Sequence, residues 1–272
     1  MSPPTILNQE QFLRYNNSGP RYTSYPTANE FTETYTRDTY QEAALLSNQS
    51  AKPLSLYFHI PFCDTICFYC ACNKIATKDR SKASTYLHYL FKEIELQAAL
   101  YDKSRVVDQL HFGGGTPTFI SLEQMRALLE QTKKHFQLRD DDRGEYSIEI
   151  DPRECSKEML IGLRQLGFNR LSLGVQDFDQ NVQKAINRIQ PAELTYQTIS
   201  TAREHGYHSI SVDLIYGLPL QSIESFSKTL EQIIDMQVDR ISLFNYAHLP
   251  HIFKPQRRIN DNELPNTETK LA

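Results

Sequence analysis

The residues with the clearest chemical potential are four cysteines crowded into the segment FHIPFCDTICFYCACNK, residues 58–74. They are Cys63, Cys67, Cys70 and Cys72. Thiols at this density could form a structural metal clip, a redox-active pair, or a cage for a metal cluster that leaves one corner open. The elements around the cysteines must help to decide between these three possibilities.

The spacing of the cysteines favours the cluster. Zinc sites usually combine two pairs of ligands separated by a longer insert, and four cysteines in so short a loop would close a tetrahedron awkwardly. The Cys67-Phe-Tyr-Cys70 stretch matches a redox pair only weakly. Three thiolates on one loop, from Cys63, Cys67 and Cys70, suit a [4Fe–4S] cube in which the fourth iron stays open. A fourth ligand would close the cube, so we interpret Cys72 as a neighbour and not a ligand.

Composition narrows the function classes. The chain has 272 residues and a formal net charge of −4, which gives no bulk attraction to nucleic acid or to an acidic membrane surface. No apolar run approaches membrane-spanning length, and the first residues lack the order of a signal peptide. We therefore expect a cytoplasmic protein with reduced thiols. The fifth cysteine, Cys155, stands alone and has no assigned role.

Strand-like and helix-like segments alternate along the chain after a short helix at 38–48. Six segments have the apolar pattern of buried strands: 53–60, 106–112, 145–150, 170–176, 209–219 and 239–246. Helical patterns fall between them: 82–101, 121–136, 156–167, 180–188, 192–206 and 222–236. This alternation predicts parallel strands joined by right-handed crossovers, in an open doubly wound sheet or in a barrel or partial barrel.

Polar or glycine-rich features mark the same end of all six predicted strands. The thiol loop follows the first strand, GGGTP the second, and the NYAHLP turn the sixth. Glu149 ends the third strand, Gln176 ends the fourth, and Asp213 lies in the fifth. Ligands of parallel α/β folds gather at the carboxyl ends of the strands, so the sequence predicts one large site there.

The ordered motifs resemble those of the radical S-adenosylmethionine (SAM) enzymes, and more closely those of the oxygen-independent coproporphyrinogen III oxidase (dehydrogenase) family. The resemblance covers nearly the whole chain and rests on SGPRYTSYPTA, LYFHIPFC, CDTICFYC, CNKI, HFGGGTPT, IEIDPRE, GFNRLSLGVQDF, VDLIYGLP and FNYAHLP. It implies an α/β fold, a partial (β/α)6 TIM-like barrel of the radical SAM type with an irregular N-terminal arm.

The resemblance also implies a reaction in haem biosynthesis. Cys63, Cys67 and Cys70 would hold the [4Fe–4S] cluster, and SAM bound at its open iron would yield a 5′-deoxyadenosyl radical. That radical would begin the oxidative decarboxylation of coproporphyrinogen III to protoporphyrinogen IX, with two SAM molecules bound. A flavodoxin- or ferredoxin-type electron donor and a monomeric state are expected, without nucleic acid or membrane as partners.

The resemblance assigns the matched positions to two groups. Contacts to the cluster-bound SAM are implied for Tyr57, Gly114 and Glu149. The shell of a second SAM is implied for Tyr69, Gly115, Thr116, Gln176, Arg188, Asp213 and Ala247. Each has an ordinary alternative: the glycines could only form a tight turn, the acids could be solvated, and the aromatic residues could only fill space.

The N-terminal arm offers cationic and aromatic residues to a substrate with four carboxylates. Arginine binds a carboxylate through two hydrogen bonds, so Arg21, with Tyr22 and Tyr25, is a candidate substrate contact. The alternative is an arm without this role. The sequence itself assigns no catalytic side chain, because the family's reactive species derives from SAM.

The chain departs from the family at its end. We expect an arm at 1–50, a barrel at 51–260, and at 261–272 only the start of the last barrel helix, with a C-terminal domain absent. The sixth strand would then lack a covering helix and expose apolar surface. The resemblance implies cluster binding but casts doubt on complete decarboxylation by this chain. Two alternatives are a related chaperone that binds haem without oxidase activity and a zinc-binding α/β protein.

Overall fold

The core of the molecule is a curved, parallel sheet. The computed structural model describes positions 10, 14, 26–27, 30–50 and 52–271. The sheet runs in the order β1-β4-β6-β7-β8-β9, and each neighbouring pair is parallel. The strands are β1 (Leu54–Ile60), β4 (Val106–Gly114), β6 (Glu145–Ile150), β7 (Arg170–Gln176), β8 (Ser209–Tyr216) and β9 (Arg240–Asn245). All six strands predicted from the sequence are confirmed.

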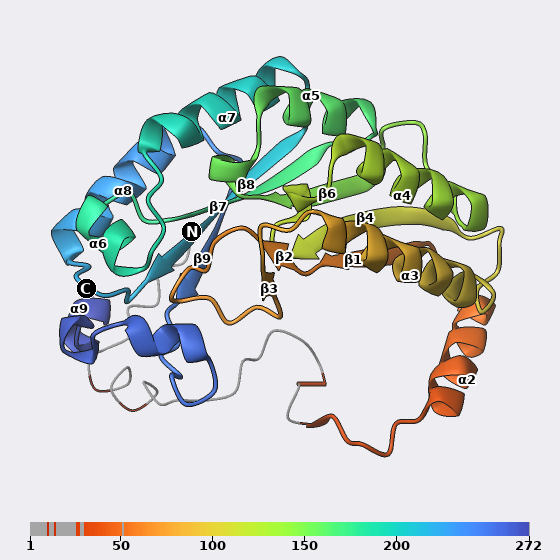
Figure 1. Ribbon diagram of the computed structural model, residues 1–272, viewed down its shortest axis with the longest axis horizontal. Helices are drawn as coiled ribbons and strands as arrows, with labels where there is room; N and C mark the ends of the chain where they lie inside the picture. Colours follow the sequence, from red (N-terminus) through yellow and green to blue (C-terminus); the bar gives the residue numbers. More distant parts are fainter. Residues whose placement is uncertain (1–9, 11–13, 15–25, 28–29, 51, 272) are drawn as a thin grey trace, which may run out of the picture.

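Helices cover the convex side of this sheet, as Figure 1 shows. They are α3 (Ser81–Ala98), α4 (Leu122–His135), α5 (Lys157–Gln165), α7 (Ala192–Glu204) and α8 (Ile223–Asp235), while the short helix α6 (Gln180–Ala185) lies beyond the carboxyl end of β7. Local sequence sets where several begin. Ser121 and Gln124 form a capping box at α4, and Ser222 and Ser225 form another at α8. The fold is therefore an incomplete (β/α)6 barrel, as predicted.

The main core lies between the sheet and these helices. Phe112, Ile148, Leu173 and Val212 come from four successive strands, and none has more than a trace of exposed surface. Burying each such side chain contributes about 1.5–3 kcal/mol, so this layer is a principal source of stability. The concave face of the sheet is left for polar groups.

A second, smaller core lies at the carboxyl ends of the strands, and we call it the mouth cluster. It contains Val182, Ile186, Ile215, Leu218, Tyr246 and Ile259, with Phe68, Tyr69 and Leu264 packed against it. These residues come from the segment between β1 and β3 (residues 61–74), which we call the cysteine loop, from α6, from β8 and its following turn, and from the segment after β9. The mouth cluster therefore joins loops that are far apart in the sequence.

Short elements that the sequence did not predict complete the fold. Strands β2 (Phe62–Cys63) and β3 (Ile75–Ala76) form a two-stranded sheet, and β5 (Gln137–Leu138) pairs with β4. Single-turn 3-10 helices are η2 (Asn48–Ser50), η3 (Pro117–Phe119), η4 (Pro152–Glu154), η5 (Lys254–Arg258) and η6 (Asp261–Glu263). The C-terminal segment holds η6 and the short helix α9 (Thr267–Leu271). One short element was predicted, since the helix expected at 38–48 is α2 (Arg37–Ser47).

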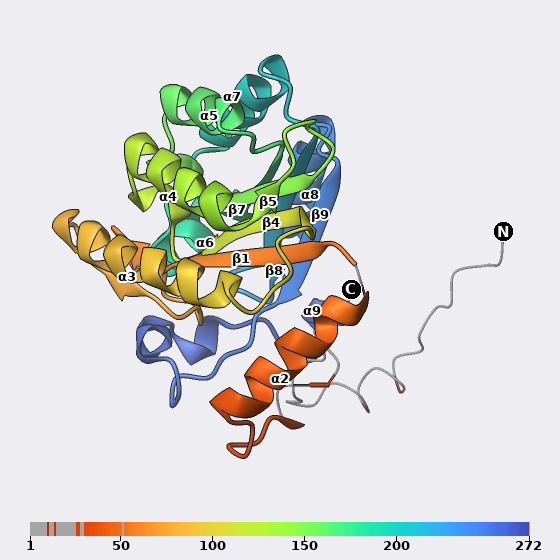
Figure 2. The same ribbon diagram turned by 90° about the vertical axis from the view of Figure 1, so that its right-hand side faces the viewer.

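Helix α2 lies beside the amino end of β1, as the turned view in Figure 2 shows, and across the molecule from α6 and α9 in Figure 1. Asn48 donates to the carbonyl of Leu100 at 3.0 Å, and Arg105 donates to Ser47 at 2.9 Å. The tyrosine hydroxyl of Tyr40 donates to Gln97 in α3. These contacts attach α2 to α3 and to the segment between α3 and β4.

Strand β9 has the exposed apolar surface that the sequence predicts. Ile241, Leu243 and Phe244 are 42%, 51% and 52% exposed.

In the part of the chain that the structure describes, no helix is both long enough and apolar enough to cross a bilayer.

The glycine turn, residues 113–115, includes the end of β4 and is closely surrounded by other groups. Gly114 has φ +116°, a backbone conformation that a side chain would strain. A Cβ at Gly115 would lie 2.6 Å from the carbonyl oxygen of Phe62, while one at Gly113 would lie 2.8 Å from the carboxylate of Glu149. The difference matters because backbone cannot move aside as the end of a side chain can.

A buried aspartate fixes the turn after β7. Gln176 has φ +73°, an unusual conformation for a residue other than glycine. The next residue, Asp177, is fully buried and accepts hydrogen bonds from Gln221 at 2.5 Å and Thr229 at 2.9 Å. Asp177 thus ties the turn to helix α8, and this constraint helps to hold Gln176 in its conformation.

We predict that Gly115→Ala lowers the free energy of unfolding by about 1–3 kcal/mol, because its Cβ would meet backbone. Gly113→Ala should cost less, because the Glu149 side chain can shift. Urea unfolding of both variants measures the difference. An equal loss for the two variants would contradict this account of the turn.

We predict that Asp177 makes stability fall as the pH rises. Burial raises the pKa of Asp177, so the folded protein binds its proton more tightly than the unfolded chain does. Stability should therefore decline from the unfolded carboxyl pKa of about 3.9 up to the raised folded pKa. In urea melts over that interval, the unfolding free energy of wild type should therefore fall relative to that of Asp177→Asn.

Glu130→Gln removes the same charge from an exposed position on α4 and reports the general effect of net charge. If wild type and Asp177→Asn show the same pH dependence, Asp177 is not the group responsible.

Candidate functional site

The cysteine loop begins directly after β1, and backbone hydrogen bonds from the glycine turn hold its first residues. The amide of Gly115 donates to Ile60 at 2.8 Å, and that of Thr116 donates to Phe62 at 2.7 Å. On the outer side, the amide of Thr77 donates to Cys63 at 2.9 Å within the small β2–β3 sheet. The first cysteine therefore lies between two segments that fix its backbone.

The far side of the loop is attached to the segment after α6 and to η5. The amide of Phe68 donates to Ile186 at 2.9 Å, and the Asn187 side chain donates to Ile66 at 2.8 Å. The buried Gln256 side chain donates to the carbonyl of Tyr69 at 3.0 Å. Together with the mouth cluster, these bonds hold the loop over the end of the sheet.

The cysteines differ in burial and in charge preference. Cys63 and Cys67 are buried, Cys70 is partly buried, Cys72 is exposed, and all are free thiols. Burial raises the pKa of Cys63 to about 11, with smaller contributions from Cys70 and Cys67. A hydrogen bond from Cys72 lowers the pKa of Cys70 to about 5. Cys63, Cys67 and Cys70 are thus close enough to influence one another.

The cysteines do not form a compact single-ion site. Among the described residues, no three His, Cys, Asp or Glu side chains converge on a point that could hold one metal ion. A cube has a different requirement, because each of its thiolates binds a separate iron. The donor set of three thiols on one anchored loop fits a cluster of this kind.

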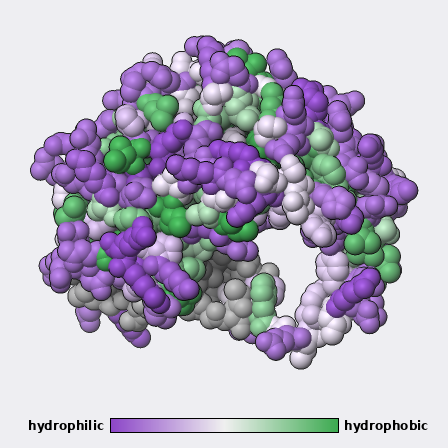
Figure 3. Space-filling view, viewed as in Figure 1, coloured by the Kyte–Doolittle hydropathy of each residue, from purple (hydrophilic) through white to green (hydrophobic). Residues whose placement is uncertain are grey.

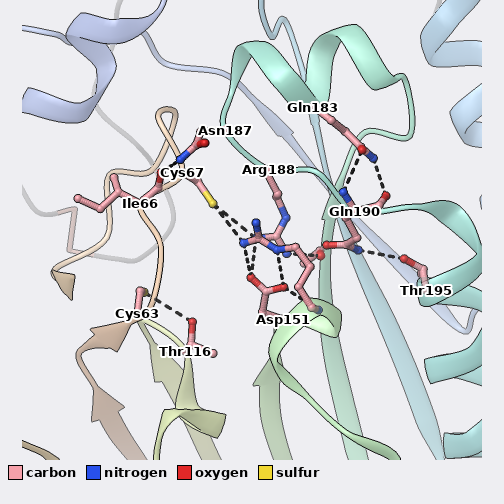
Figure 4. A network of polar contacts seen from close by, with 12 residues as sticks. Cys63, Ile66, Cys67, Thr116, Asp151, Gln183, Asn187, Arg188, Gln190 and Thr195 are labelled. Carbon is pink, nitrogen blue, oxygen red and sulfur yellow. Dashed lines mark hydrogen bonds and ion pairs between the residues drawn. The ribbon is translucent and has the colours of Figure 1, made fainter. Parts of the chain in front are cut away.

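Arg188 lies under the loop, in a network that Figure 4 shows. Its side chain is only 6% exposed and donates to Asp151 at 2.9 Å, to the carbonyl of Gly174 at 2.6 Å and to the Cys67 sulfur at 3.6 Å. Its Nε is buried without a hydrogen-bond partner. An unpaired buried donor among polar groups suits a ligand that can accept a hydrogen bond.

Polar side chains on the concave face lie next to the glycine turn. Glu149 accepts from the amide of Gly114 at 3.1 Å, and His111 contacts Glu149 at 3.4 Å and Ser147 at 2.6 Å. The ring of Tyr57 stacks on His111 at 5.7 Å between centroids. The first predicted SAM group, Tyr57, Gly114 and Glu149, is therefore brought together.

The second predicted group is spread around the mouth. Asp213 accepts from Ser172 at 3.1 Å, and burial raises the pKa of Asp213. Thr116 donates to the Cys63 sulfur at 3.6 Å. The carbonyls of Tyr69 and Ala247 share the donor Gln256. Gly115, Gln176 and Arg188 complete the set at the same end of the sheet, and the SAM contacts of both groups stay predictions.

Several site residues were not singled out from the sequence. They are Asp151, Arg153, His111, Gln256 and His59, whose ring Nδ1 lies 3.0 Å from the Tyr57 hydroxyl. Asp151 directly follows the third strand, so the strand-end rule could have found it. Gln256 acts across 187 positions on Tyr69, and no local pattern reveals such a contact. The proposed substrate contacts Arg21, Tyr22 and Tyr25 lie outside the described residues.

The chain is similar in sequence to a known protein family and to several named proteins. A family model described as the Radical SAM superfamily matches residues 57–233. Proteins named oxygen-independent coproporphyrinogen III oxidase are 54% identical in Pseudomonas aeruginosa and 48% identical in Escherichia coli K12. Each alignment covers 95% of this chain, and 56% and 55% of the respective relatives. The chain thus spans about half the length of the curated relatives it matches.

Solved structures give the same result. Coproporphyrinogen III oxidase from Escherichia coli, described as a radical SAM enzyme, superimposes with a TM-score of 0.88 at 46% identity. The match covers 95% of this chain and 57% of that one. The more distant anSMEcpe with bound AdoMet has a TM-score of 0.52 at 13% identity over 72% of this chain and 52% of that one, which is likeness of fold alone. The family model, the anchored cysteine loop and the incomplete barrel agree, and the chain belongs to the radical SAM superfamily.

Proposed function

We propose that Cys63, Cys67 and Cys70 hold a [4Fe–4S] cluster and that SAM binds at its open iron. The observation that carries this proposal is the meeting of the cysteine loop, the glycine turn and Glu149 at one end of the sheet. When bound, the cluster supplies the electron that cleaves SAM to methionine and a 5′-deoxyadenosyl radical. The side chains around it bind, orient and shield the reactants.

The roles of the surrounding residues follow from their chemistry. The Glu149 carboxylate is a suitable acceptor for the ammonium group of SAM, and its bond to the Gly114 amide fixes its direction. Tyr57, stacked on His111, offers an aromatic face at the same place. Arg188 and Asp213 have opposite charges that could bind the carboxylate and the ammonium of a second SAM. Two SAM molecules are therefore part of the proposal.

We further propose that the substrate is coproporphyrinogen III. Each of two propionate side chains would lose a hydrogen atom to the radical, then release CO2 and pass one electron to an external one-electron acceptor, and so become a vinyl group. The names of the relatives support this substrate. The N-terminal arm, at 1–50, would contact the substrate carboxylates through Arg21, with Tyr22 and Tyr25, above a barrel at 51–260. A flavodoxin- or ferredoxin-type donor, a cytoplasmic location and a monomeric state belong to the same proposal.

We predict that anaerobic reconstitution with iron and sulfide loads about four irons and four sulfides per chain. Addition of dithionite and SAM should then yield methionine and 5′-deoxyadenosine. Cys63→Ser, Cys67→Ser and Cys70→Ser should each lose most of the bound iron, because a hydroxyl is a poor ligand for iron in such a cluster. Iron and sulfide analysis measures the first effect and chromatography the second.

Cys72→Ser and Cys155→Ser are the matched controls, and both should retain iron. Zinc in place of iron and sulfide would contradict the cluster. With coproporphyrinogen III present, vinyl formation tests the substrate directly. A tight haem complex without vinyl formation would instead favour the chaperone alternative.

A further inference from the structure

Asp151 holds two arginines in a nearly buried ion-pair network. Arg153 binds it in bidentate fashion, with Nη2 at 2.7 Å from Oδ2 and Nε at 3.0 Å from Oδ1. Arg188 binds the same carboxylate at 2.9 Å. Burial alone would raise the pKa of Asp151, but Arg188 and Arg153 lower it overall, so the carboxylate stays charged. The side chains of Asp151 and Arg153 are 10% and 17% exposed.

Both guanidinium groups also reach the sulfur of Cys67. Arg153 Nη2 and Arg188 Nη1 each lie 3.6 Å from Cys67 Sγ. Figure 4 shows Arg188 and Asp151 beside this cysteine. Two cations and one anion leave an excess positive charge next to one of the three proposed cluster ligands. The charge is fixed, because arginine does not lose its proton in proteins.

Arg153 can be separated from the proposed binding of SAM. Its side-chain hydrogen bonds go to Asp151 and Cys67, whereas Arg188 also binds Gly174 and has an unpaired Nε. Arg153 belongs to neither predicted group of SAM contacts. Its geometry is also set in advance, since the rigid guanidinium fork matches the carboxylate of Asp151.

A hydrogen-bond donor to a ligand sulfur changes the reduction potential of an iron–sulfur cluster. A cluster held by three thiolates becomes more negative when it is reduced, and the electron comes from an external reductant without any bond in the protein breaking. Hydrogen bonds to the sulfurs and nearby positive charge stabilise the reduced form relative to the oxidised form. At low exposure this electrostatic effect is poorly screened by solvent.

We propose that Arg153 is a positioning residue that sets the reduction potential of the cluster. Asp151 holds its guanidinium against Cys67, and this contact makes the cluster easier to reduce. The inference rests on the proposed function, because it requires the cluster that Cys67 would hold.

The test compares reduction potentials of reconstituted proteins by dithionite titration monitored by electron paramagnetic resonance. Arg153→Met keeps the length of the side chain without charge or donors. It should lower the equilibrium constant for one-electron reduction about tenfold, which equals about 59 mV for a one-electron couple. Arg153→Lys keeps the charge and should fall between this variant and wild type.

Arg139→Met is the matched control. Arg139 also pairs with an aspartate, Asp108. It directly follows β5, which pairs with the first residues of β4, so it lies at the amino end of the sheet and away from the cysteine loop. This variant should keep the wild-type potential. A shift as large as that of Arg153→Met would show that loss of any arginine ion pair produces the effect, and would overturn the inference.

Iron and sulfide content distinguishes the possible failures. If wild type binds no cluster, the proposed function fails. If wild type and Arg153→Met bind the same cluster at the same potential, only the inference about Arg153 fails. Should Arg153→Met not fold, Arg153→Leu also removes both the charge and the hydrogen-bond donors. A wild-type potential in that variant would equally overturn the proposal.

Discussion

The candidate site depends on the attachment of one loop to the end of the sheet. The cysteine loop has little regular structure of its own, yet hydrogen bonds from the glycine turn, the segment after α6 and η5 hold it in place. Each bond contributes only about 0.5–1.5 kcal/mol, so no single one fixes the loop. Together with the mouth cluster, these bonds hold the loop that carries the three thiols at the carboxyl ends of the strands.

The buried carboxylates at this end of the sheet differ in their neighbours and therefore in their pKa. Asp151 lies between two arginines and stays ionised, whereas burial raises the pKa of Asp177 and Asp213. The positive groups gather near Cys67, and the carboxylate of Glu149 lies on the concave face beside the glycine turn. The positive groups beside the cysteine loop and the carboxylate beside the glycine turn are therefore held in separate places at this end of the sheet.

Much of the fold follows from the sequence because its signals are local. Each parallel strand is a short apolar run between helical patterns, and Ser121 and Ser222 mark helix starts that the structure retains. The two-residue strands β2 and β3 are too short to give a periodic signal. The strand-end rule selected Glu149, Gln176 and Asp213 as candidates, and their roles stay predictions. It could not reveal that Arg153 turns back to Cys67, 86 positions earlier, because that contact depends on the tertiary fold.

The most direct test of the account is Mössbauer spectroscopy of the anaerobically reconstituted chain, with and without SAM. Three thiolates leave one iron of the cube without a protein ligand, so SAM should change the signal of one iron and leave the others nearly unchanged. A spectrum in which no iron responds to SAM, or in which the iron lacks the signature of a sulfide-bridged cube, would contradict the open-iron site formed by Cys63, Cys67 and Cys70.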